Sequence, residues 1–389
     1  MSEASPSLAK ALPAVAFVWG QFAPYHRDRC EAAAARLAGR YRVCGIEIAS
    51  RNELYDWAPS AAADGFAFST ALPGRSWQET SRRDRLAALT VELRHSGADI
   101  VFLCHFDQPE IFLTALWLRL RGKRVFIMQD SKFDDRPRQL WRELIKAFLY
   151  LPYHGALASG ARTKDYLRLL GLRAQRIVLG YDTVSVARIR RLAGAPPAPA
   201  GAPFAARHFT AVARFVEKKN LPLLLAAYDL YRQTAGASAR DLVLVGGGPL
   251  EAALRAEVAR RDLAGVRFAG FLQEEGVAQG LAQSLALILP SREEQWGLVV
   301  NEALAMGLPV LVSENVGARD TLVRQGVNGY VFEADNVEGL AGGMVRLATD
   351  EAEWRRLSEG SNALAERGDV AHFAQAVAEL IGLPGAEAA

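Results

Sequence analysis

Short apolar runs alternate with longer amphipathic segments along the first half of the chain. The runs that we predict as strands are 14–20, 41–48, 99–104, 124–129, 155–159 and 176–180. The segments that we predict as helices are 28–40, 79–95, 108–121, 136–150 and 162–170. Such alternation is typical of β-α units around a parallel sheet. Because the strands are continuously apolar, we expect helices on both faces of this sheet.

The pattern stops at residues 192–207, LAGAPPAPAGAPFAAR, and resumes directly afterwards. Crowded Pro, Ala and Gly without apolar periodicity favour an interdomain linker over the alternative, a long surface loop. The strands predicted beyond it are 208–213, 241–246, 266–270, 285–290 and 309–313. The helices predicted there are 221–234, 249–261, 274–284, 297–306, 317–325, 336–348, 350–366 and 369–381. The chain is therefore predicted to have an α/β fold with two doubly wound, Rossmann-like domains.

The predicted domains are residues 1–191 and 208–368, followed by a C-terminal helix within 369–389. An open parallel sheet binds its ligands outside the carboxyl ends of its strands. Two such domains that face each other would therefore hold a ligand in the cleft between them.

Composition limits the function further. The chain has 389 residues, 50% of them apolar and 23% charged, which is enough for two or three domains and excludes a disordered protein. Its 46 basic and 43 acidic residues give a net charge of +3, too small a surplus to indicate a nucleic-acid partner. The cysteines, Cys30, Cys44 and Cys104, are odd in number and too few for a four-cysteine zinc site.

The sequence contains no signal for a membrane span. No uncharged apolar run reaches about 18 residues, the length that a spanning helix needs. The first residues, MSEASPSLAKALPAV, lack the charged start and unbroken apolar run of a signal peptide. We therefore expect a soluble, cytoplasmic protein.

The densest chemical signal is PSREEQWGLVVNEALAMGLPVLVS at 290–313. A strand ends at its start, and a helix is predicted to open near Gly297, where the missing side chain permits close approach. The unpaired amides of the first turn, including those of Leu298 and Val299, form a ready site for a phosphate. Glu302, just inside the helix, can accept hydrogen bonds from two neighbouring hydroxyls of a ribose. The alternative for Glu302 is a solvated helix residue favoured by the helix dipole.

This segment resembles the retaining nucleotide-sugar glycosyltransferases of family 4, also called glycosyl transferases group 1. The resemblance rests on the spacing Glu294–x7–Glu302 and the run NEALAMGLPV; it is strong over 208–340 and covers the first half only in layout. It implies a GT-B fold in which the C-terminal domain binds the nucleotide sugar and the last helix crosses back to the first domain. It also implies that Glu294 contacts the transferred sugar and that Glu302 holds the ribose.

The segment ARFVEKKN at 213–220 resembles the family's loop for the donor diphosphate. Arg214 and Lys219 match the two cations that hold this group, with Lys218 as a register alternative to Lys219. Fixed cations at this place would stabilise the negative charge that bond cleavage leaves on the departing nucleotide. Taken alone, the segment would be interpreted as a basic loop before a helix.

Two further segments match donor-side elements of the family. LVGGGPLEAALRAE at 244–257 resembles its strand–Gly-x-Gly-Pro–helix turn, so Gly248 would approach the donor, and a purely structural turn is an equal alternative. VRFAGFLQEEG at 266–276 matches the strand and loop that lie against the nucleotide base. Phe271 or Leu272 would then touch the base.

The resemblance places the acceptor against the first domain. Gly20 opens the loop after the first strand, and Tyr25 and His26 follow it. The family's loop is glycine-rich here, whereas this one has a single glycine, so acceptor specificity does not carry over. His26 is left with three alternatives: a base, a hydrogen-bond donor or a helix-cap residue.

Polar residues also follow the strands 99–104 and 124–129. His105 stands where the family often has a histidine, with a satisfied loop histidine as the alternative. Many family members have His-Asp after the next strand, but this chain has Gln129 and Asp130. Glutamine cannot act as an acid or a base, although it can hydrogen-bond a sugar hydroxyl.

The predicted helix at 136–150 has a basic side and an apolar side. Its basic side comprises Arg136, Arg138, Arg142 and Lys146, opposite Leu140, Leu144 and Phe148. A basic amphipathic helix of this kind can make peripheral contact with an anionic membrane or a lipid-linked acceptor. The commoner explanation is a solvated helix face.

We predict a retaining, metal-independent hexosyltransferase that moves a sugar from a UDP- or GDP-linked donor to an acceptor hydroxyl, in glycan, glycolipid or natural-product biosynthesis. No Asp-x-Asp triplet occurs, and Asp130, Asp134 and Asp135 lack metal-ligand spacing, so we expect no metal and no cofactor. The nucleotide sugar is a co-substrate. The alternatives are a nucleotide-sugar epimerase on the same fold and a non-catalytic nucleotide-sugar-binding partner. The sugar, the base, the acceptor and the oligomeric state are not specified.

Overall fold

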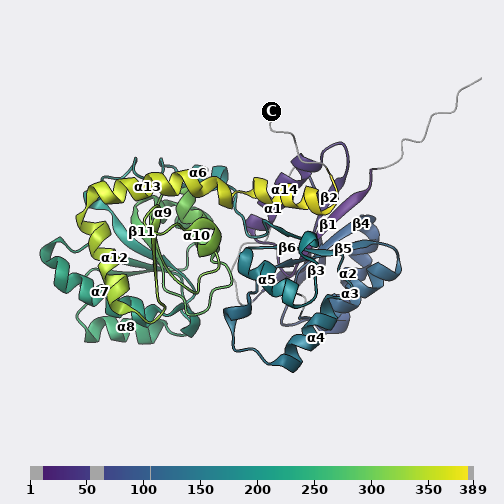
Figure 1. The fold of residues 1–389 in the computed structure, drawn as a ribbon, viewed down its shortest axis with the longest axis horizontal. Helices are drawn as coiled ribbons and strands as arrows, with labels where there is room; N and C mark the ends of the chain where they lie inside the picture. The colour runs from purple at the N-terminus through teal and green to yellow at the C-terminus, as the bar shows by residue number, and fades with distance from the viewer. Residues whose placement is uncertain (1–11, 53–64, 106, 384–389) are drawn as a thin grey trace, which may run out of the picture. The chain divides into compact units, whose positions relative to one another are not determined.

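A seven-stranded sheet occupies the N-terminal half of the computed structural model, which describes residues 12–52, 65–105 and 107–383 (Figure 1). Its strands lie in the order β3-β2-β1-β4-β5-β6-β7. Their bounds are β1 (Ala14–Trp19), β2 (Arg42–Arg51), β3 (Ala67–Ser76), β4 (Ala98–Leu103), β5 (Arg124–Gln129), β6 (Gly155–Ala158) and β7 (Ile177–Leu179). The helices of this half are α1 (Pro24–Leu37), α2 (Arg82–Ser96), α3 (Pro109–Leu120), α4 (Leu140–Tyr150), α5 (Ala161–Leu169) and α6 (Val186–Ala193).

A six-stranded sheet follows in the order β10-β9-β8-β11-β12-β13. Its strands are β8 (His208–Val212), β9 (Leu242–Val245), β10 (Val266–Gly270), β11 (Ser284–Leu289), β12 (Val310–Ser313) and β13 (Gly329–Phe332). The helices are α7 (Leu221–Ala235), α8 (Glu251–Arg260), α9 (Glu274–Ala282), α10 (Leu298–Ala305), α11 (Arg319–Leu322), α12 (Val337–Thr349), α13 (Glu351–Ala365) and α14 (Val370–Leu380).

Both sheets are doubly wound, as the sequence predicts. The pairings from β3 to β5 are parallel, and so are all pairings of the six-stranded sheet. The strand order reverses between β1 and β4 in the first sheet and between β8 and β11 in the second. In open α/β sheets, ligands bind beyond the carboxyl ends of the strands at such a reversal. The loops that follow these four strands are therefore the places to look for function.

The central strands are covered on both faces. All six residues of β1 and all six of β11 are buried, which a sheet with helices on only one side would not permit. This confirms the expectation drawn from their continuous apolar character. The helices need only carry one apolar stripe each, while the strands carry apolar residues throughout.

Two strands are absent from the sequence-based prediction, and both lie at sheet edges. β3 contains Pro73 and Gly74, and of its ten residues five are partly buried and four are exposed. β13 has four residues and is the last strand of its sheet. An edge strand needs neither a full apolar run nor every backbone donor, so its sequence lacks the signal of a central strand.

Two helices begin well after or before their predicted starts, and one helix was not predicted. α1 begins at Pro24 rather than at residue 28, because proline is well suited to the first position of a helix. α4 begins at Leu140 rather than at 136, since Pro137 disfavours helical geometry at the residue before it. The unpredicted α6 is a short helix started by Ser185, whose hydroxyl accepts from the amide of Arg188 at 3.2 Å. It takes in the first residues of the predicted linker.

By their contacts, the described residues fall into two compact units. One comprises those up to Met128, together with 145–156 and those from Val377 onward. The other comprises 129–144 and 157–376, so it holds the whole six-stranded sheet and also Gln129 and Asp130. The domain limits and the linker drawn from the sequence stay predictions.

The chain just before β8 is tied to the second sheet by one buried arginine. Arg207 is 2% exposed, and its guanidinium donates to the carbonyl oxygens of Ala282 (3.2 Å) and Ser284 (2.8 Å), beside β11. It also donates to the carbonyls of Ala200 (2.8 Å) and Ala202 (2.9 Å). Four carbonyl acceptors, two of them buried, thus depend on one cation, which fixes residues 200–207 against the sheet.

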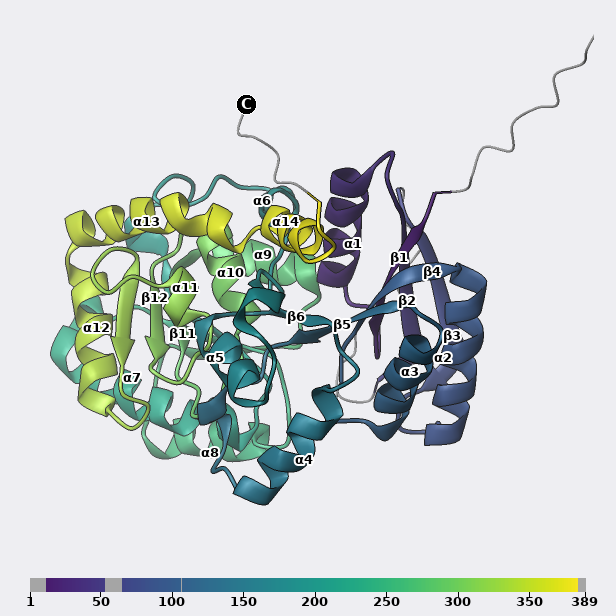
Figure 2. The same ribbon diagram turned by 45° about the vertical axis from the view of Figure 1, so that its right-hand side comes forward.

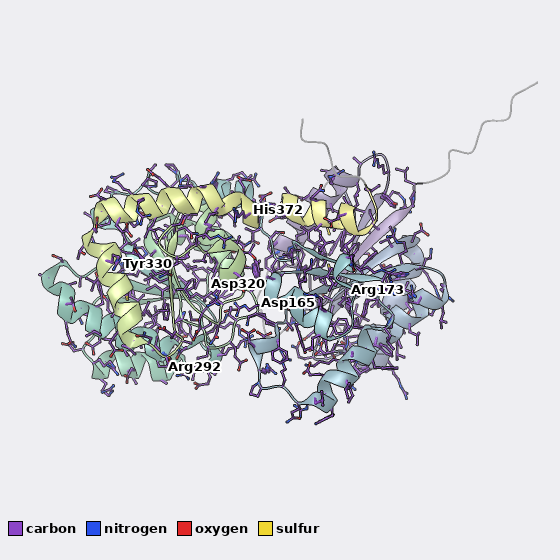
Figure 3. The ribbon with its side chains drawn as sticks, in the orientation of Figure 1. Asp165, Arg173, Arg292, Asp320, Tyr330 and His372 are labelled. Atoms are coloured by element: carbon purple, nitrogen blue, oxygen red, sulfur yellow. The ribbon has the colours of Figure 1, made fainter. Side chains whose placement is uncertain are left out.

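We predict that Arg207→Met lowers the free energy of unfolding of the second unit by about 2–4 kcal/mol, because buried carbonyls lose a charged donor. Urea denaturation followed by circular dichroism measures the change. The control is Arg173→Met, at an exposed arginine labelled in Figure 3. It should change the free energy of unfolding by less than about 0.5 kcal/mol. Equal effects of the two substitutions would contradict the anchoring role of Arg207.

Candidate functional site

The reversal in the second sheet brings two loops together. One follows β8 and contains Arg214, which is partly buried, and the other follows β11 and leads to α10. Their backbones are joined directly, because the carbonyl of Lys218 accepts from the amide of Arg292 at 2.8 Å and from that of Glu293 at 3.3 Å. Arg292 is labelled in Figure 3. The two segments that the sequence marks as donor-binding therefore form one structure.

An ion pair joins the side chains of these loops. The Lys219 ammonium donates to the carboxylate of Glu294, and the two side chains are only 16% and 11% exposed. The buried Ser291 hydroxyl donates to the same carboxylate at 3.0 Å. Lys218, the register alternative, has an exposed side chain. The cation that points into the site is Lys219.

The turn at Gly248 has a clear structural reason. Gly248 has φ +151°, and a Cβ there would lie 2.7 Å from the carbonyl oxygen of Phe215 and 2.9 Å from its amide nitrogen. The Phe215 amide donates to the carbonyl of Gly247 at 2.8 Å. Only glycine lets this turn lie against the residue next to Arg214. The turn thus supports the loop after β8, whatever else it contacts.

Helix α10 begins where the sequence predicts. Gly297 caps it with φ +97°, in the left-handed region that favours glycine, and a Cβ would lie 2.9 Å from Leu289. Leu298 and Val299 are its first residues, and amides at this place have no acceptor within the helix. The Val300 amide donates to the carbonyl of Gly297 at 2.9 Å, so of these three amides only those of Leu298 and Val299 are left for an anion.

Glu302 lies in a charged group that the sequence analysis does not predict. Its neighbours in this group are Arg188 of α6 and Glu274 of α9, which form an ion pair with each other. Burial raises the pKa of Glu302 to about 7; Arg188 opposes this rise and Glu274 adds to it. Glu302 is therefore a partly buried carboxyl rather than the solvated helix residue predicted as the alternative. The segments QEEG and VARIRR hold Glu274 and Arg188, but nothing in their spacing relates them to Glu302.

Phe271 follows β10 and is 50% exposed. An aromatic ring left half in solvent has a face available for stacking on a planar ligand. It lies three residues before Glu274, on the loop that leads into α9. Phe271, which is predicted to contact the base, thus lies on the loop just before Glu274, a neighbour of Glu302.

Gln129 ends strand β5 and Asp130 follows it, and both residues belong to the second unit. The pKa of Asp130 is raised to about 7 by burial and by the nearby carboxylates of Asp182, Asp135 and Glu294, in that order of effect. The interaction with Glu294 brings the predicted polar end of β5 and the predicted donor loop into one site. Gln129 is 4% exposed, and its amide nitrogen has no hydrogen-bond partner within the described part of the chain.

The reversal in the first sheet brings a second group of predicted residues together. Gly20 follows β1, and a Cβ there would lie 2.9 Å from Nε2 of His105, which follows β4. His105 is exposed and has φ +60°, an uncommon conformation for histidine. The surrounding protein lowers its pKa through desolvation, although Asp107 and Glu110 act in the opposite direction. The structure thus places the imidazole of His105 beside Gly20.

His26 adopts the third of its predicted alternatives. Its Nδ1 accepts from the amide of Ala23 at 2.9 Å, which caps helix α1, and its ring stacks on Trp19 with centroids 4.4 Å apart. It is buried, and desolvation together with Arg29 holds its pKa well below the usual range. Tyr25, by contrast, is partly exposed and packs against His26 edge to face at 4.5 Å. Of the two, Tyr25 is the one with surface to offer an acceptor.

The second unit holds several acidic side chains near Glu294, but they form no metal cluster in the described ranges. Within residues 12–52, 65–105 and 107–383, no three His, Cys, Asp or Glu side chains are placed to hold a metal ion. Several carboxylates of this unit are instead paired with cations. Arg162 of α5, for example, binds Asp320 (labelled in Figure 3) and donates to the carbonyl of Val316 at 2.7 Å.

Comparison with known proteins finds similarity mainly in the second half of the chain. Residues 205–380 match the family described as Glycosyl transferases group 1. The O-antigen chain mannosyltransferase C of Escherichia coli is 31% identical over 156 residues, which are 39% of this chain and 40% of the relative. The D-inositol 3-phosphate glycosyltransferase of a Nocardioides species is 30% identical over 152 residues, 36% of this chain and 33% of the relative. The chain thus spans well under half of the length of these relatives.

Solved structures resemble the chain over nearly its whole length. Sucrose-phosphate synthase from Thermosynechococcus elongatus matches with a TM-score of 0.72 and 18% identity, over 95% of this chain and 98% of its own. Anabaena HepE, solved in complex with UDP and glucose, matches with a TM-score of 0.70 and 17% identity, over 95% and 99%. At such identities the likeness shows the fold alone, and the GT-B fold class predicted from the sequence is confirmed.

The raised pKa of Glu302 makes stability depend on pH. The folded chain keeps this proton up to about pH 7, whereas the unfolded chain loses it near the ordinary value of 4.5. The free energy of unfolding therefore falls as pH rises through this window, and the loss is complete above it. Glu302→Gln removes the charge, so it should stabilise the protein at pH 8 and leave it unchanged at pH 4.

We expect a gain of about 1–3 kcal/mol at pH 8, in proportion to the size of the pKa change. Thermal denaturation at the two pH values measures it. The matched control is Glu338→Gln, an exposed residue of α12, which should have no pH-dependent effect. If Glu302→Gln stabilised the protein equally at both pH values, the carboxyl would not be the titrating group.

Proposed function

We propose, from the membership of residues 205–380 in the glycosyl transferases group 1, that this protein transfers a sugar from a nucleoside-diphosphate sugar to an acceptor hydroxyl. The observation that carries the proposal is the Lys219–Glu294 pair at the strand-order reversal of the second sheet. It joins the cation and the carboxylate that the resemblance assigns to the diphosphate and to the sugar. We further infer retention of anomeric configuration and independence of metal.

The diphosphate has three groups to bind it in this proposal. Arg214 and Lys219 supply positive charge on the loop after β8, and the first amides of α10 supply donors on the loop after β11. Because the Lys219 ammonium already reaches Glu294, it lies within reach of an anion bound beside that carboxylate. These fixed donors would stabilise the charge on the leaving nucleotide without a metal ion.

The nucleoside would occupy the side of the site formed by α6, α9 and α10. Glu302 would accept hydrogen bonds from the ribose hydroxyls, and the half-exposed ring of Phe271 would stack on the base. A carboxyl with its pKa near 7 needs to ionise to accept both hydrogen bonds. Binding of the donor would therefore favour loss of the Glu302 proton.

The chemical step exchanges two bonds at the anomeric carbon. The bond from this carbon to the β-phosphate oxygen breaks, and its electron pair goes to that oxygen. The acceptor oxygen bonds to the carbon from the same face, and its proton passes to the departing phosphate. Retention then needs no covalent carboxylate intermediate. Glu294 would orient the sugar, while Gln129 and Asp130 would offer it polar contacts.

The acceptor would bind against the first sheet. Gly20 and His105 meet at the reversal between β1 and β4, where a ligand is expected in this type of sheet. Tyr25 is partly exposed on the same loop, and His26 would act as a helix-cap residue that positions it. UDP or GDP as the nucleotide, and glycan, glycolipid or natural-product biosynthesis as the pathway, remain part of the proposal.

Adjacent lysines provide a matched test of the donor site. We predict that Lys219→Met weakens the binding of the correct nucleoside diphosphate at least about 10-fold, since one charge-assisted contact is lost. Lys218→Met removes the same charge one residue earlier, where the side chain is exposed, and should change the affinity less than about 2-fold. Isothermal titration calorimetry with UDP and GDP measures both. Equal losses would point to general electrostatic attraction rather than to a site.

The reaction itself is tested with donor and acceptor panels. The rate of transfer from donor to acceptor should be the same with and without EDTA. NMR of the product should show the anomeric configuration of the donor. Arg214→Ala should lower kcat about 100-fold or more while the fold, followed by circular dichroism, is retained. Isomerisation of the donor without any acceptor would instead identify an epimerase. Binding without turnover of any acceptor would favour a non-catalytic nucleotide-sugar-binding protein.

A further inference from the structure

Helix α4 is turned opposite to an ordinary surface helix. Its apolar residues face solvent: Leu140 is 79% exposed, Trp141 58%, Leu144 64%, Ile145 52% and Phe148 58%. Leu151, directly after the helix, is 70% exposed. We call these six residues the α4 apolar face. They recur three and four positions apart, so they form one continuous stripe.

The side that packs on the protein carries a buried carboxylate. Glu143 is buried, and its carboxylate accepts from the Tyr166 hydroxyl at 2.6 Å and lies 3.7 Å from Arg138. Tyr150, two turns later, is 2% exposed. These contacts fix the rotation of the helix about its axis. The α4 apolar face therefore cannot turn inward without taking a bonded carboxylate out into solvent and breaking its hydrogen bond.

A second apolar stripe lies on the neighbouring helix α3. Its exposed residues are Leu113 (47%), Leu116 (40%) and Leu120 (81%). The rings of Phe112 on α3 and Phe148 on α4 have their centroids 5.6 Å apart, so the two helices are in contact (Figure 1, Figure 2). Monomeric proteins rarely expose this many large apolar side chains in one region, and such patches mark contact with a partner or a membrane.

The charge around the stripe selects between these partners. Residues 136–154 contain four cationic side chains and one carboxylate, and that carboxylate is the buried Glu143. Helix α3 contains one acidic residue, Glu110, which is buried and paired with Arg85, and residues 111–129 contain arginine and lysine but no acidic residue. Arg136 and Arg142 are exposed at one end and along the flank of the α4 apolar face, and the Arg136 guanidinium lies 3.6 Å from the carboxylate of Glu293. The surface is therefore apolar at its centre and positive at its edge, without exposed negative charge in these segments.

We propose that α4, with α3 beside it, docks this protein on the surface of an anionic lipid membrane. Leucine, tryptophan and phenylalanine would enter the boundary between headgroups and acyl chains, while Arg136 and Arg142 would meet lipid phosphates. None of the described helices is long and apolar enough to cross a membrane, so the contact would be peripheral. The proposal is independent of the transfer reaction.

Vesicle cosedimentation tests the apolar half of the proposal. The full chain should bind vesicles of phosphatidylcholine mixed with phosphatidylglycerol. Leu144→Gln should lower the partition coefficient at least about 5-fold, because a polar side chain would replace a leucine that enters the membrane. Leu169→Gln is the matched control: it makes the same change at a leucine that is 62% exposed on α5, and it should bind as the parent does. Equal losses with both variants would overturn the assignment to α4.

The charged half is tested in the same way. Arg142→Glu should weaken binding to the mixed vesicles at least about 10-fold, and added salt should weaken the parent similarly. Arg173→Glu, at an exposed arginine elsewhere, should have little effect. Binding to pure phosphatidylcholine should be much weaker. Equal binding to neutral and anionic vesicles would contradict the role given to the cations.

Two further outcomes would overturn the proposal. Light scattering of the lipid-free chain could reveal a dimer that Leu144→Gln dissociates; with no vesicle binding, the α4 apolar face would then be an interface between two copies. Absence of both vesicle binding and self-association would show that neither occupies it. Thermal denaturation of each variant checks the fold, which exposed positions should leave unchanged.

Discussion

The reversal of strand order between β8 and β11 is the constraint on which the candidate site depends. The connections that follow these two adjacent parallel strands run in opposite directions. The carboxyl ends of the strands, and the first residues of both loops, therefore lie beside each other. Backbone hydrogen bonds from the second loop to the carbonyl of Lys218 hold the loops together. The Lys219–Glu294 pair then completes the junction with side chains. Without this topology, residues 75 positions apart in the chain would have no reason to meet.

The ionisable side chains of the site differ in whether they have a partner of opposite charge. Lys219 is paired, whereas Glu302 and Asp130 lie where burial and neighbouring carboxylates raise their pKa to about 7. Such carboxyls lower the stability of the folded chain when they ionise. A site that stores this unfavourable energy can release it when a ligand offers hydrogen-bond donors or positive charge. The same trade between stability and function is common in enzymes.

Helix α4 shows how little a hydrophobic period says about direction. The period identifies two faces, but burial of Glu143 and Tyr150 turns the apolar one outward. A polar contact to Tyr166 decides the rotation, and that residue is on another helix. The basic amphipathic pattern is thus present in the sequence, while the exposure that makes it interesting is a property of the fold.

The sequence by itself determined the fold class, the central strands and the segments that carry the candidate chemistry, because apolar runs, glycine turns and helix starts are local features. Gly248 and Gly297 are examples: their backbone geometry requires glycine, and the residues next to them in the chain predict a turn. Only the tertiary structure decided that Lys219 rather than Lys218 meets Glu294, that Arg188 and Glu274 stand beside Glu302, and that Asp130 shares a site with Glu294. These are contacts between elements far apart in the chain, and a side chain's partners and pKa depend on distance in space rather than on spacing in sequence.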